Sequence, residues 1–347
     1  MSTLNLIVPG LLGPFSNDAP NYISEQLQQP EFNLLRSWLS HSRSEEIKPQ
    51  TFYQTLQSKI CPQSNLSLCQ LTADFDQIKY SSENLYRLDP VHFKAESDHA
   101  VLLGSDLLGI EKEEALQLIE AFNQHFIDES IKLHFGDLDR WYLETARPLQ
   151  LSFNSKDYSL GRDIKHFMPV GDDALWWRKI LNETQMLFFA HEINQQREDN
   201  AQLSINGLWL WDSSFESTVT EFKNNAELFA DDDLIKSMAR QSFSSVNSLN
   251  DFFDNRAHND KSHEDITVVI DEIYEAVCYG DVDAWVESLE NFCTKSLPEI
   301  ARLLNSKVIK SINLYPCDGR QIYIDRLQLL KFWKRTMPLN NYIAISK

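Results

Sequence analysis

Seven residues between positions 140 and 206 have side chains suited to holding a small anion. Arginine guanidinium groups match the oxygen pairs of carboxylates and phosphates, and asparagine and aspartate orient such ligands or the arginines beside them. The sequence therefore predicts a binding site for a small phosphorylated or carboxylate metabolite. The predicted ligand-binding residues are Arg140, Arg147, Arg162, Asp163, Asn194, Arg197 and Asn206.

Two structural interpretations compete with this site. The chain has 51 acidic and 32 basic residues, so the arginines are also explained as partners of surplus acids in surface salt bridges. Asn194, Arg197 and Asn206 are also explained as groups that cap a helix end and tie it to the next strand. Both interpretations stay open from the sequence alone.

Neither a catalytic nucleophile nor a metal site stands out elsewhere. The five cysteines include no Cys-x-x-Cys pair, which predicts reduced thiols in a cytoplasmic protein. His258 and His263 lie among acidic residues, but their stretch is poor in apolar residues and we predict a surface loop over residues 243–263. We expect His191 to pack or to cap a helix, and His92 to be structural.

A long helix and a strand are predicted to position the end of this site. The helix begins after Gly171, with Asp172 and Asp173 as its N-cap and first-turn acids. Apolar residues recur at three- and four-residue spacing, which predicts one buried face. They are Trp177, Ile180, Leu181, Thr184, Leu187 and Phe188. Residues 205–211 then read as a buried strand.

The order of elements predicts an α/β fold with a mainly parallel sheet and an inserted α+β module. Residues 4–8, 66–71, 228–230 and 266–270 read as core strands, and residues 312–315 and 321–324 as a hairpin. A long helix is expected over residues 281–305, and a last helix around Leu327 to Trp333. Strands, one helix and a hairpin between residues 85 and 145 predict the module. We expect a core of residues 1–84 and 166–347 and a module of residues 85–165.

Charge and hydropathy exclude several partners. The formal net charge of −19 repels phosphate backbones, so we expect no nucleic-acid partner. The apolar run at residues 4–12 is interrupted by Pro9 and Gly10 and lacks a basic start, which predicts neither a signal peptide nor a membrane span.

The middle of the chain resembles the archaeal-type cofactor-independent phosphoglycerate mutases of the alkaline-phosphatase-like superfamily. The similarity covers residues 85–212 most clearly. Its segments are residues 110–115 (Ile-Glu-Lys-Glu-Glu-Ala), 140–147 (Arg-Trp-Tyr-Leu-Glu-Thr-Ala-Arg), 161–164 (Gly-Arg-Asp-Ile), 191–197 (His-Glu-Ile-Asn-Gln-Gln-Arg) and 204–206 (Ser-Ile-Asn). The resemblance implies an alkaline-phosphatase-like core with an inserted domain.

A bacterial offshoot, the RpfE-type regulatory proteins, is more similar still. Its hallmarks resemble residues 9–14 (Pro-Gly-Leu-Leu-Gly-Pro), 89–92 (Asp-Pro-Val-His), 182–187 (Asn-Glu-Thr-Gln-Met-Leu) and 330–335 (Leu-Lys-Phe-Trp-Lys-Arg). The resemblance implies a regulatory protein with the mutase architecture.

Departures from the mutase pattern predict that catalysis has been lost. An active member carries a metal-binding Asp-Gly after strand one, where this chain has Val8-Pro9-Gly10. It also carries a Gly-Ser-Asp nucleophile before the inserted domain and an Asp-His metal pair near the C-terminus. The segment before residue 85 contains no Gly-Ser-Asp, and no Asp-His dipeptide occurs after residue 99. Phosphoryl transfer of this kind needs two divalent cations about 4 Å apart and a nucleophile. We therefore expect no catalytic residue, no metal site and no cofactor.

The resulting expectation is a regulatory, non-catalytic protein that binds a small anionic metabolite or a protein partner. One alternative is a divergent metal-dependent phosphoglycerate mutase or phosphatase that uses manganese or zinc held by Asp254, His258 and His263. A second alternative is a protein-interaction module without a small ligand.

Overall fold

The protein forms two compact units, which we describe separately. The computed structural model describes residues 2–13, 23–47, 51–60, 67–81, 84–214, 224–240, 243–255, 265–331 and 333–344. Unit 1 comprises residues 1–62 and 221–347, and unit 2 comprises residues 63–220. A mixed α/β fold was predicted and is confirmed, since each unit combines a sheet with helices.

Unit 1 contains a sheet of seven described strands in the order β2-β12-β11-β1-β10-β8-β9. β1 lies at its centre and pairs in parallel with β10 and β11, β8 pairs in parallel with β10 and β9, and β12 is antiparallel to β11 and β2. The strands are β1 (Ser2–Ile7), β2 (Arg43–Glu46), β8 (Asn224–Phe229), β9 (Phe243–Asn247), β10 (Ile266–Val269), β11 (Ile309–Tyr315) and β12 (Arg320–Asp325).

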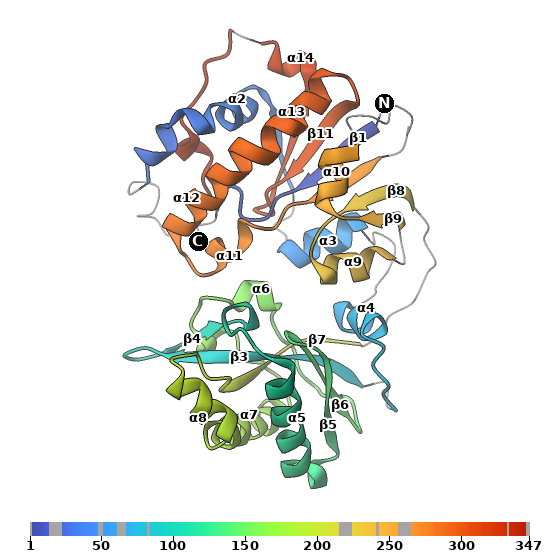
Figure 1. The fold of residues 1–347 in the computed structure, drawn as a ribbon, viewed down its shortest axis with the longest axis vertical. Helices are drawn as coiled ribbons and strands as arrows, with labels where there is room; N and C mark the ends of the chain where they lie inside the picture. The colour runs from blue at the N-terminus through green and yellow to red at the C-terminus, as the bar shows by residue number, and fades with distance from the viewer. Residues whose placement is uncertain are drawn as a thin grey trace. The chain divides into compact units, whose positions relative to one another are not determined.

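Helices of unit 1 cover the sheet with apolar side chains. Figure 1 shows α2, α12 and α13 across one face, where Trp38, Trp285 and Ile300 join the strand residues in one buried cluster. Helices α3 and α9 contact each other and carry further buried residues, including Leu56 and Met238. The α-helices are α2 (Asn33–His41), α3 (Phe52–Ile60), α9 (Asp233–Arg240), α10 (Leu249–Asn255), α11 (Tyr274–Cys278), α12 (Val282–Asn291), α13 (Leu297–Asn305) and α14 (Arg326–Leu329).

Shorter helical segments complete unit 1. The expected long helix over residues 281–305 is present as α12 and α13 joined by a π-helical stretch, η6 (Phe292–Ser296). The 3₁₀ segments are η1 (Gln26–Gln28), η2 (Pro30–Phe32) and η7 (Leu339–Tyr342).

Unit 2 contains a sheet of five described strands, all antiparallel, in which β3 pairs with β4, β6 and β7 and β6 also pairs with β5. They are β3 (Leu85–Ala95), β4 (Ala100–Leu103), β5 (Ile131–Asp137), β6 (Arg140–Thr145) and β7 (Gly207–Ser213). The predicted module boundaries at residues 84 and 165 differ from those of unit 2. The reason is that β7 hydrogen-bonds along β3 and α7 packs on the same sheet, so the chain up to β7 belongs to this unit.

Helices α5 and α7 cover one face of this sheet. Phe122 from α5 and Trp177, Ile180 and Phe188 from α7 pack against strand residues such as Leu143. The helical segments of unit 2 are α4 (Leu68–Phe75), η3 (Ser105–Leu107), α5 (Lys112–His125), η4 (Ile127–Glu129), α6 (Lys156–Ser159), η5 (Ile164–His166), α7 (Ala174–Phe189) and α8 (Glu192–Asp199).

Three local predictions were wrong. Residues 66–71 were expected to form a core strand, but α4 begins at Leu68, with the Ser67 hydroxyl accepting from the Gln70 N–H as an N-cap. The predicted loop at 243–263 contains β9 and α10, whose Phe252 packs in the core. The predicted last helix ends at Leu329 and leaves Leu330 and Trp333 exposed.

No described helix has both the length and the apolar character needed to span a bilayer.

Candidate functional site

Strand alternation in unit 2 gathers polar side chains on the sheet face opposite α5 and α7. Successive residues of a strand point to opposite faces. In β3, Tyr86 and Leu88 join the apolar cluster beneath α5 and α7, which turns Arg87 and Asp89 to the other face. A register shift in the β3–β7 pairing places Asp212 opposite Arg87. Local strand geometry thus assembles a buried polar cluster.

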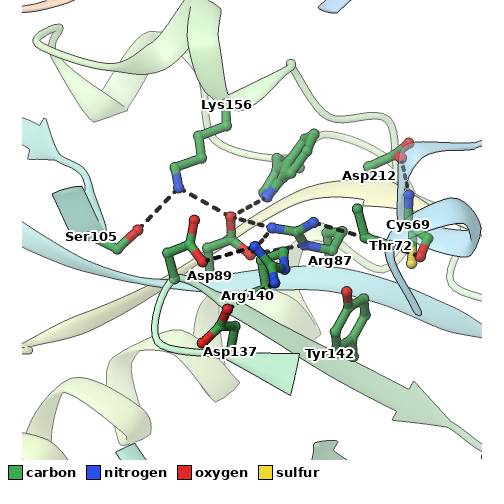
Figure 2. Close-up of polar contacts among 12 residues, drawn as sticks. Cys69, Thr72, Arg87, Asp89, Ser105, Asp137, Arg140, Tyr142, Lys156 and Asp212 are labelled. Atoms are coloured by element: carbon green, nitrogen blue, oxygen red, sulfur yellow. Dashed lines mark hydrogen bonds and ion pairs between the residues drawn. The ribbon is translucent and has the colours of Figure 1, made fainter. Parts of the chain in front are cut away.

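Asp89 lies at the centre of this cluster (Figure 2). Its carboxylate accepts hydrogen bonds from Arg87 Nε at 3.0 Å, from Lys156 Nζ at 3.1 Å and from Trp211 Nε1 at 2.9 Å. Lys156 also donates to Ser105 Oγ at 3.2 Å. Asp89 is fully buried, so this carboxylate is compensated by two cations and an indole N–H.

Arg87 is held from three sides. Its Nη1 donates to Thr72 Oγ1 at 2.9 Å, and its guanidinium lies 5.4 Å from the ring centroid of Tyr142 and 4.9 Å from that of Trp211. Burial by itself would lower the pKa of Arg87, but the Asp89 carboxylate raises it above its ordinary value. Arg87 is therefore a permanent buried cation.

A neighbouring group centres on Asp76. Arg140 donates to its two oxygens through Nε and Nη2, each at 3.0 Å, and the Tyr142 hydroxyl donates at 2.6 Å. Arg140 also contacts Asp137 at 2.9 Å. Burial raises the pKa of Tyr142 above its ordinary value, so this phenol stays protonated. The predicted ligand residue Arg140 is thus engaged by carboxylates of the chain itself.

Cys69 and Asp212 form the edge of the cluster. The Asp212 carboxylate accepts from the Cys69 backbone N–H at 2.7 Å. Burial raises the pKa of Asp212 to about 6, against the lowering effect of backbone N–H donors and of Arg87. Burial and the nearby Asp212 raise the pKa of the Cys69 thiol, which opposes the thiolate form that nucleophilic catalysis requires. The cluster contains buried charged groups, but it raises the pKa values of the Cys69 thiol and the Tyr142 phenol and therefore activates neither as a nucleophile.

Arg147 and Arg162 occupy different environments. Arg147 is exposed and binds both carboxylate oxygens of Asp173, at 2.8 and 2.6 Å. The hydrogen bond from Arg147 lowers the pKa of Asp173 to about 2. Arg162 is also exposed, and its guanidinium lies 4.7 Å from the Tyr158 ring and 5.9 Å from the Phe167 ring. Within the described part of the chain, no carboxylate forms an ion pair with Arg162.

Two aspartates near these arginines act locally. Asp163 accepts from the Lys165 N–H at 3.0 Å as the N-cap of η5, and lies 3.7 Å from His166 Nε2. Asp173 precedes α7 as predicted, but its side chain makes no capping bond because Arg147 and the Gln150 N–H engage it.

The first turn of α8 is tied to the chain that leads into β7. The Asn194 side chain donates to the carbonyls of Phe188 and Ile205 and accepts from the Ile205 N–H. Asn206 exchanges two hydrogen bonds with the Phe93 backbone. These contacts fit the structural interpretation, in which the two asparagines tie a helix end to the next strand.

Arg197 is 1% exposed and joins three segments. It donates to Glu114 Oε2 at 2.6 Å, to the Leu203 carbonyl at 2.8 Å and to the Leu108 carbonyl. His191 caps α8 through the Ile193 N–H, and His92 contacts the Ser204 carbonyl, as expected for structural histidines.

The four predicted arginines therefore have four separate sets of contacts. A ligand role for any of the seven residues stays a prediction, and Arg162 is the one whose guanidinium has contacts only with aromatic rings among those described. Sequence reasoning missed Arg87, Asp89 and Lys156. Charged residues two apart in an otherwise apolar strand were the available signal for Arg87 and Asp89.

Three aspartates lie at the carboxyl end of the parallel strands in unit 1, where a divalent metal would be held in the mutase fold. Asp231 accepts from the Leu249 N–H and Asp232 from the Ile235 N–H, so both act as backbone caps. Burial and the nearby Asp232 raise the pKa of Asp271 to about 6. Across the described residues, no group of three or more His, Cys, Asp or Glu side chains is arranged to hold a metal ion. His258 and His263 lie outside the described residues.

Comparisons with known proteins place the fold. No protein-family model matches the chain, and no curated protein matches it by sequence. Among solved structures, the chain is similar to the PH0037 protein from Pyrococcus horikoshii, with a TM-score of 0.51, 12% identity, and coverage of 98% of this chain and 97% of that one. It also matches a cofactor-independent phosphoglycerate mutase from Thermoplasma acidophilum, with a TM-score of 0.45, 14% identity, and coverage of 99% and 96%. The first similarity shows a shared fold over nearly the whole chain.

Proposed function

We propose that this chain is a phosphoglycerate-mutase-like regulatory protein of the RpfE type. In this proposal it has an alkaline-phosphatase-like core, acts in the cytoplasm and works by binding a small phosphorylated or carboxylate metabolite rather than by turnover. It uses no metal or other cofactor.

The observation that carries the proposal is the structure at the end of β1. The mutase pattern requires a metal-binding aspartate here, whereas the chain has the buried residue Val8. The backbone after it is engaged in structural bonds, because Gly10 N–H donates to the Pro316 carbonyl and Trp285 Nε1 donates to the Gly10 carbonyl at 2.8 Å. The central strand is therefore followed by an apolar residue and by a backbone already hydrogen-bonded within the chain, and not by a metal ligand.

The ligand side of the proposal depends on Arg162. Its cation lies against Tyr158 and Phe167 and is exposed, so its donors face solvent without an ion-pair partner among the described residues. Asp163 fixes the following turn. An anion at Arg162 would gain charge-assisted hydrogen bonds without breaking a salt bridge, whereas Arg140, Arg147 and Arg197 would each have to leave a carboxylate.

The test combines thermal shift with an activity assay. A phosphorylated metabolite at a hundred times its dissociation constant should stabilise the protein by about 2.7 kcal/mol. We expect such a shift with 3-phosphoglycerate or a related compound, and we expect Arg162→Gln to reduce it while Arg178→Gln, which replaces an exposed arginine of α7, leaves it unchanged. No shift with any phosphorylated or carboxylate compound would favour the interaction module without a small ligand.

A divergent mutase or phosphatase is kept as second candidate because of Asp271. A half-buried carboxyl group with a pKa of about 6, beside Asp232, follows β10 at the edge where parallel sheets bind ligands. Protein purified without chelator and found to hold two equivalents of manganese or zinc would favour this candidate. Turnover of 3-phosphoglycerate with added manganese, lost in Asp271→Asn, would overturn the non-catalytic proposal.

A further inference from the structure

A hollow in unit 1 collects two arginines and no described carboxylate. It has a volume of about 570 Å³ and lies between the start of α2 and the C-terminal segment. The described residues that line it are Gln28, Arg36, Arg335, Thr336, Met337, Pro338 and Asn341. Arg335 belongs to the closing motif of residues 330–335, for which the proposed function has no role.

The two sides of the hollow are held together by hydrogen bonds around Ser40. The Ser40 hydroxyl donates to the Arg36 carbonyl at 2.7 Å, and it accepts from the Met337 N–H at 2.9 Å and from the Tyr342 hydroxyl at 3.0 Å. The Tyr342 carbonyl in turn accepts from Arg320 Nη2 at 2.7 Å. The C-terminal segment is therefore fixed beside α2, and the hollow has defined walls.

Both arginines have unused donors. Arg36 Nη1 donates to the Gln28 carbonyl at 3.3 Å, while Arg36 Nε is buried and has no hydrogen-bond partner in the described structure. A buried donor without a partner costs about 1–3 kcal/mol, so the hydrogen-bonding capacity of Arg36 is not fully used by the described chain. Arg335 is exposed, and no described carboxylate lies within ion-pair distance of either guanidinium.

The local charge of the C-terminal segment also favours an anion in the hollow. The chain as a whole carries a net charge of −19, yet residues 326–347 contain five basic and no acidic residues. In an acidic protein most arginines have a nearby carboxylate, as Arg140 and Arg147 do. A hollow with two arginines and polar Gln28 and Asn341 therefore presents positive charge and hydrogen-bond donors to an anion.

We propose that Arg36 and Arg335 form a binding site for the carboxylate or phosphate group of a small molecule. This site lies in unit 1 and goes beyond the proposed function, whose ligand residue Arg162 belongs to unit 2.

The test is calorimetric titration of the full chain with inorganic phosphate and, separately, with succinate, at constant ionic strength and low chloride. Saturable binding of phosphate would identify a phosphorylated ligand, and saturable binding of succinate a carboxylate ligand. Loss of one charge-assisted pair should weaken binding at least about tenfold in Arg36→Gln and in Arg335→Gln. Arg335 is exposed, so its variant should fold normally even if Arg36→Gln does not.

Two controls separate this site from others. Arg326→Gln removes a cation from the same segment that does not line the hollow, and Arg162→Gln removes the ligand residue proposed in unit 2. Arg326→Gln should bind the probe as the unmodified protein does. Arg162→Gln should remove only the binding that belongs to the site proposed in unit 2 and should keep saturable binding at the hollow. The proposal is overturned if neither probe binds saturably, or if Arg335→Gln binds with unchanged affinity.

Discussion

In the buried cluster of unit 2, two cationic side chains share a single carboxylate. Asp89 serves Arg87 and Lys156 at once, and all three side chains are buried. Removing one partner of a buried ion pair leaves an uncompensated charge in a low-dielectric environment, which costs far more than the pair itself contributes. The cluster is consequently the most sensitive point of unit 2 to a change of a single charge.

Asp89→Asn should lower the free energy of unfolding by about 3–5 kcal/mol, because two buried cations would lose their shared anion. Urea denaturation followed by tryptophan fluorescence measures this change. As a control, Glu299→Gln removes the exposed partner of Arg302 and should cost less than about 1 kcal/mol. Equal, small losses in both variants would show that Asp89 does not compensate buried charge.

Asp212 predicts a pH dependence of stability. Its pKa is about 6 in the folded protein and near 3.8 when unfolded, so the folded state keeps a proton that the unfolded state has released. The contribution of Asp212 to the unfolding free energy therefore falls as the pH rises from about 4 to about 6, and stays low above that range. A shift of roughly two pKa units corresponds to about 2–3 kcal/mol.

Asp212→Asn removes this titration, so its unfolding free energy relative to the unmodified protein should rise by about 2–3 kcal/mol between pH 4 and pH 7. Urea unfolding of both proteins across this pH range measures the difference. If the asparagine amide fails to replace a hydrogen bond of the carboxyl group, the unfolding free energy of the variant changes by the same amount at every pH. A difference that stays constant with pH would contradict the assignment.

At the scale of elements, the first turn of α5 has a double role. Glu114 accepts from the Glu111 N–H at 2.9 Å in a reciprocal capping box, and it also neutralises the buried Arg197 of α8. Capping is visible in the sequence because the two residues lie three apart. Pairing with Arg197 is not, since it joins residues 83 positions apart.

Glu114→Ala should therefore cost about 3 kcal/mol, well above the roughly 1 kcal/mol of a lost cap, because Arg197 would remain buried without its carboxylate. Glu113→Ala, in the same turn but exposed, should change stability by no more than about 0.5 kcal/mol. Denaturation of both variants measures the two changes. If Glu114→Ala costs only as much as a cap, the ion pair contributes nothing.

At the scale of the whole molecule, unit 2 is one continuous stretch with its own buried cluster and its own sheet. We expect residues 63–220, produced alone, to fold cooperatively, whereas residues 85–165 should not. The shorter piece lacks β7 and α7, which close the sheet and its apolar face. Near-ultraviolet circular dichroism and urea unfolding distinguish the two pieces. A cooperative transition in residues 85–165 would contradict the structural boundary.

The sequence by itself determined the elements whose signals are local. Apolar spacing predicted the buried face of α7. Short apolar runs predicted β1 and β10, and turn residues predicted the hairpin of β11 and β12. Local signals failed at residues 66–71, where an apolar run of six residues does not distinguish a strand from a buried helix. Local signals also failed at residues 243–255, for a different reason: their polar composition concealed β9 and α10.

Only the tertiary structure decided the partners of each charge. Arg140, Arg147 and Arg197 each meet a different carboxylate supplied by a distant segment. Asp89 and Lys156 are 67 positions apart, and no periodic pattern relates them. Composition therefore indicated that anion-binding side chains were present, while pairing across the fold determined which of the four predicted arginines are bound to carboxylates of the chain. Arg140, Arg147 and Arg197 are, and Arg162 has no such partner among the described residues.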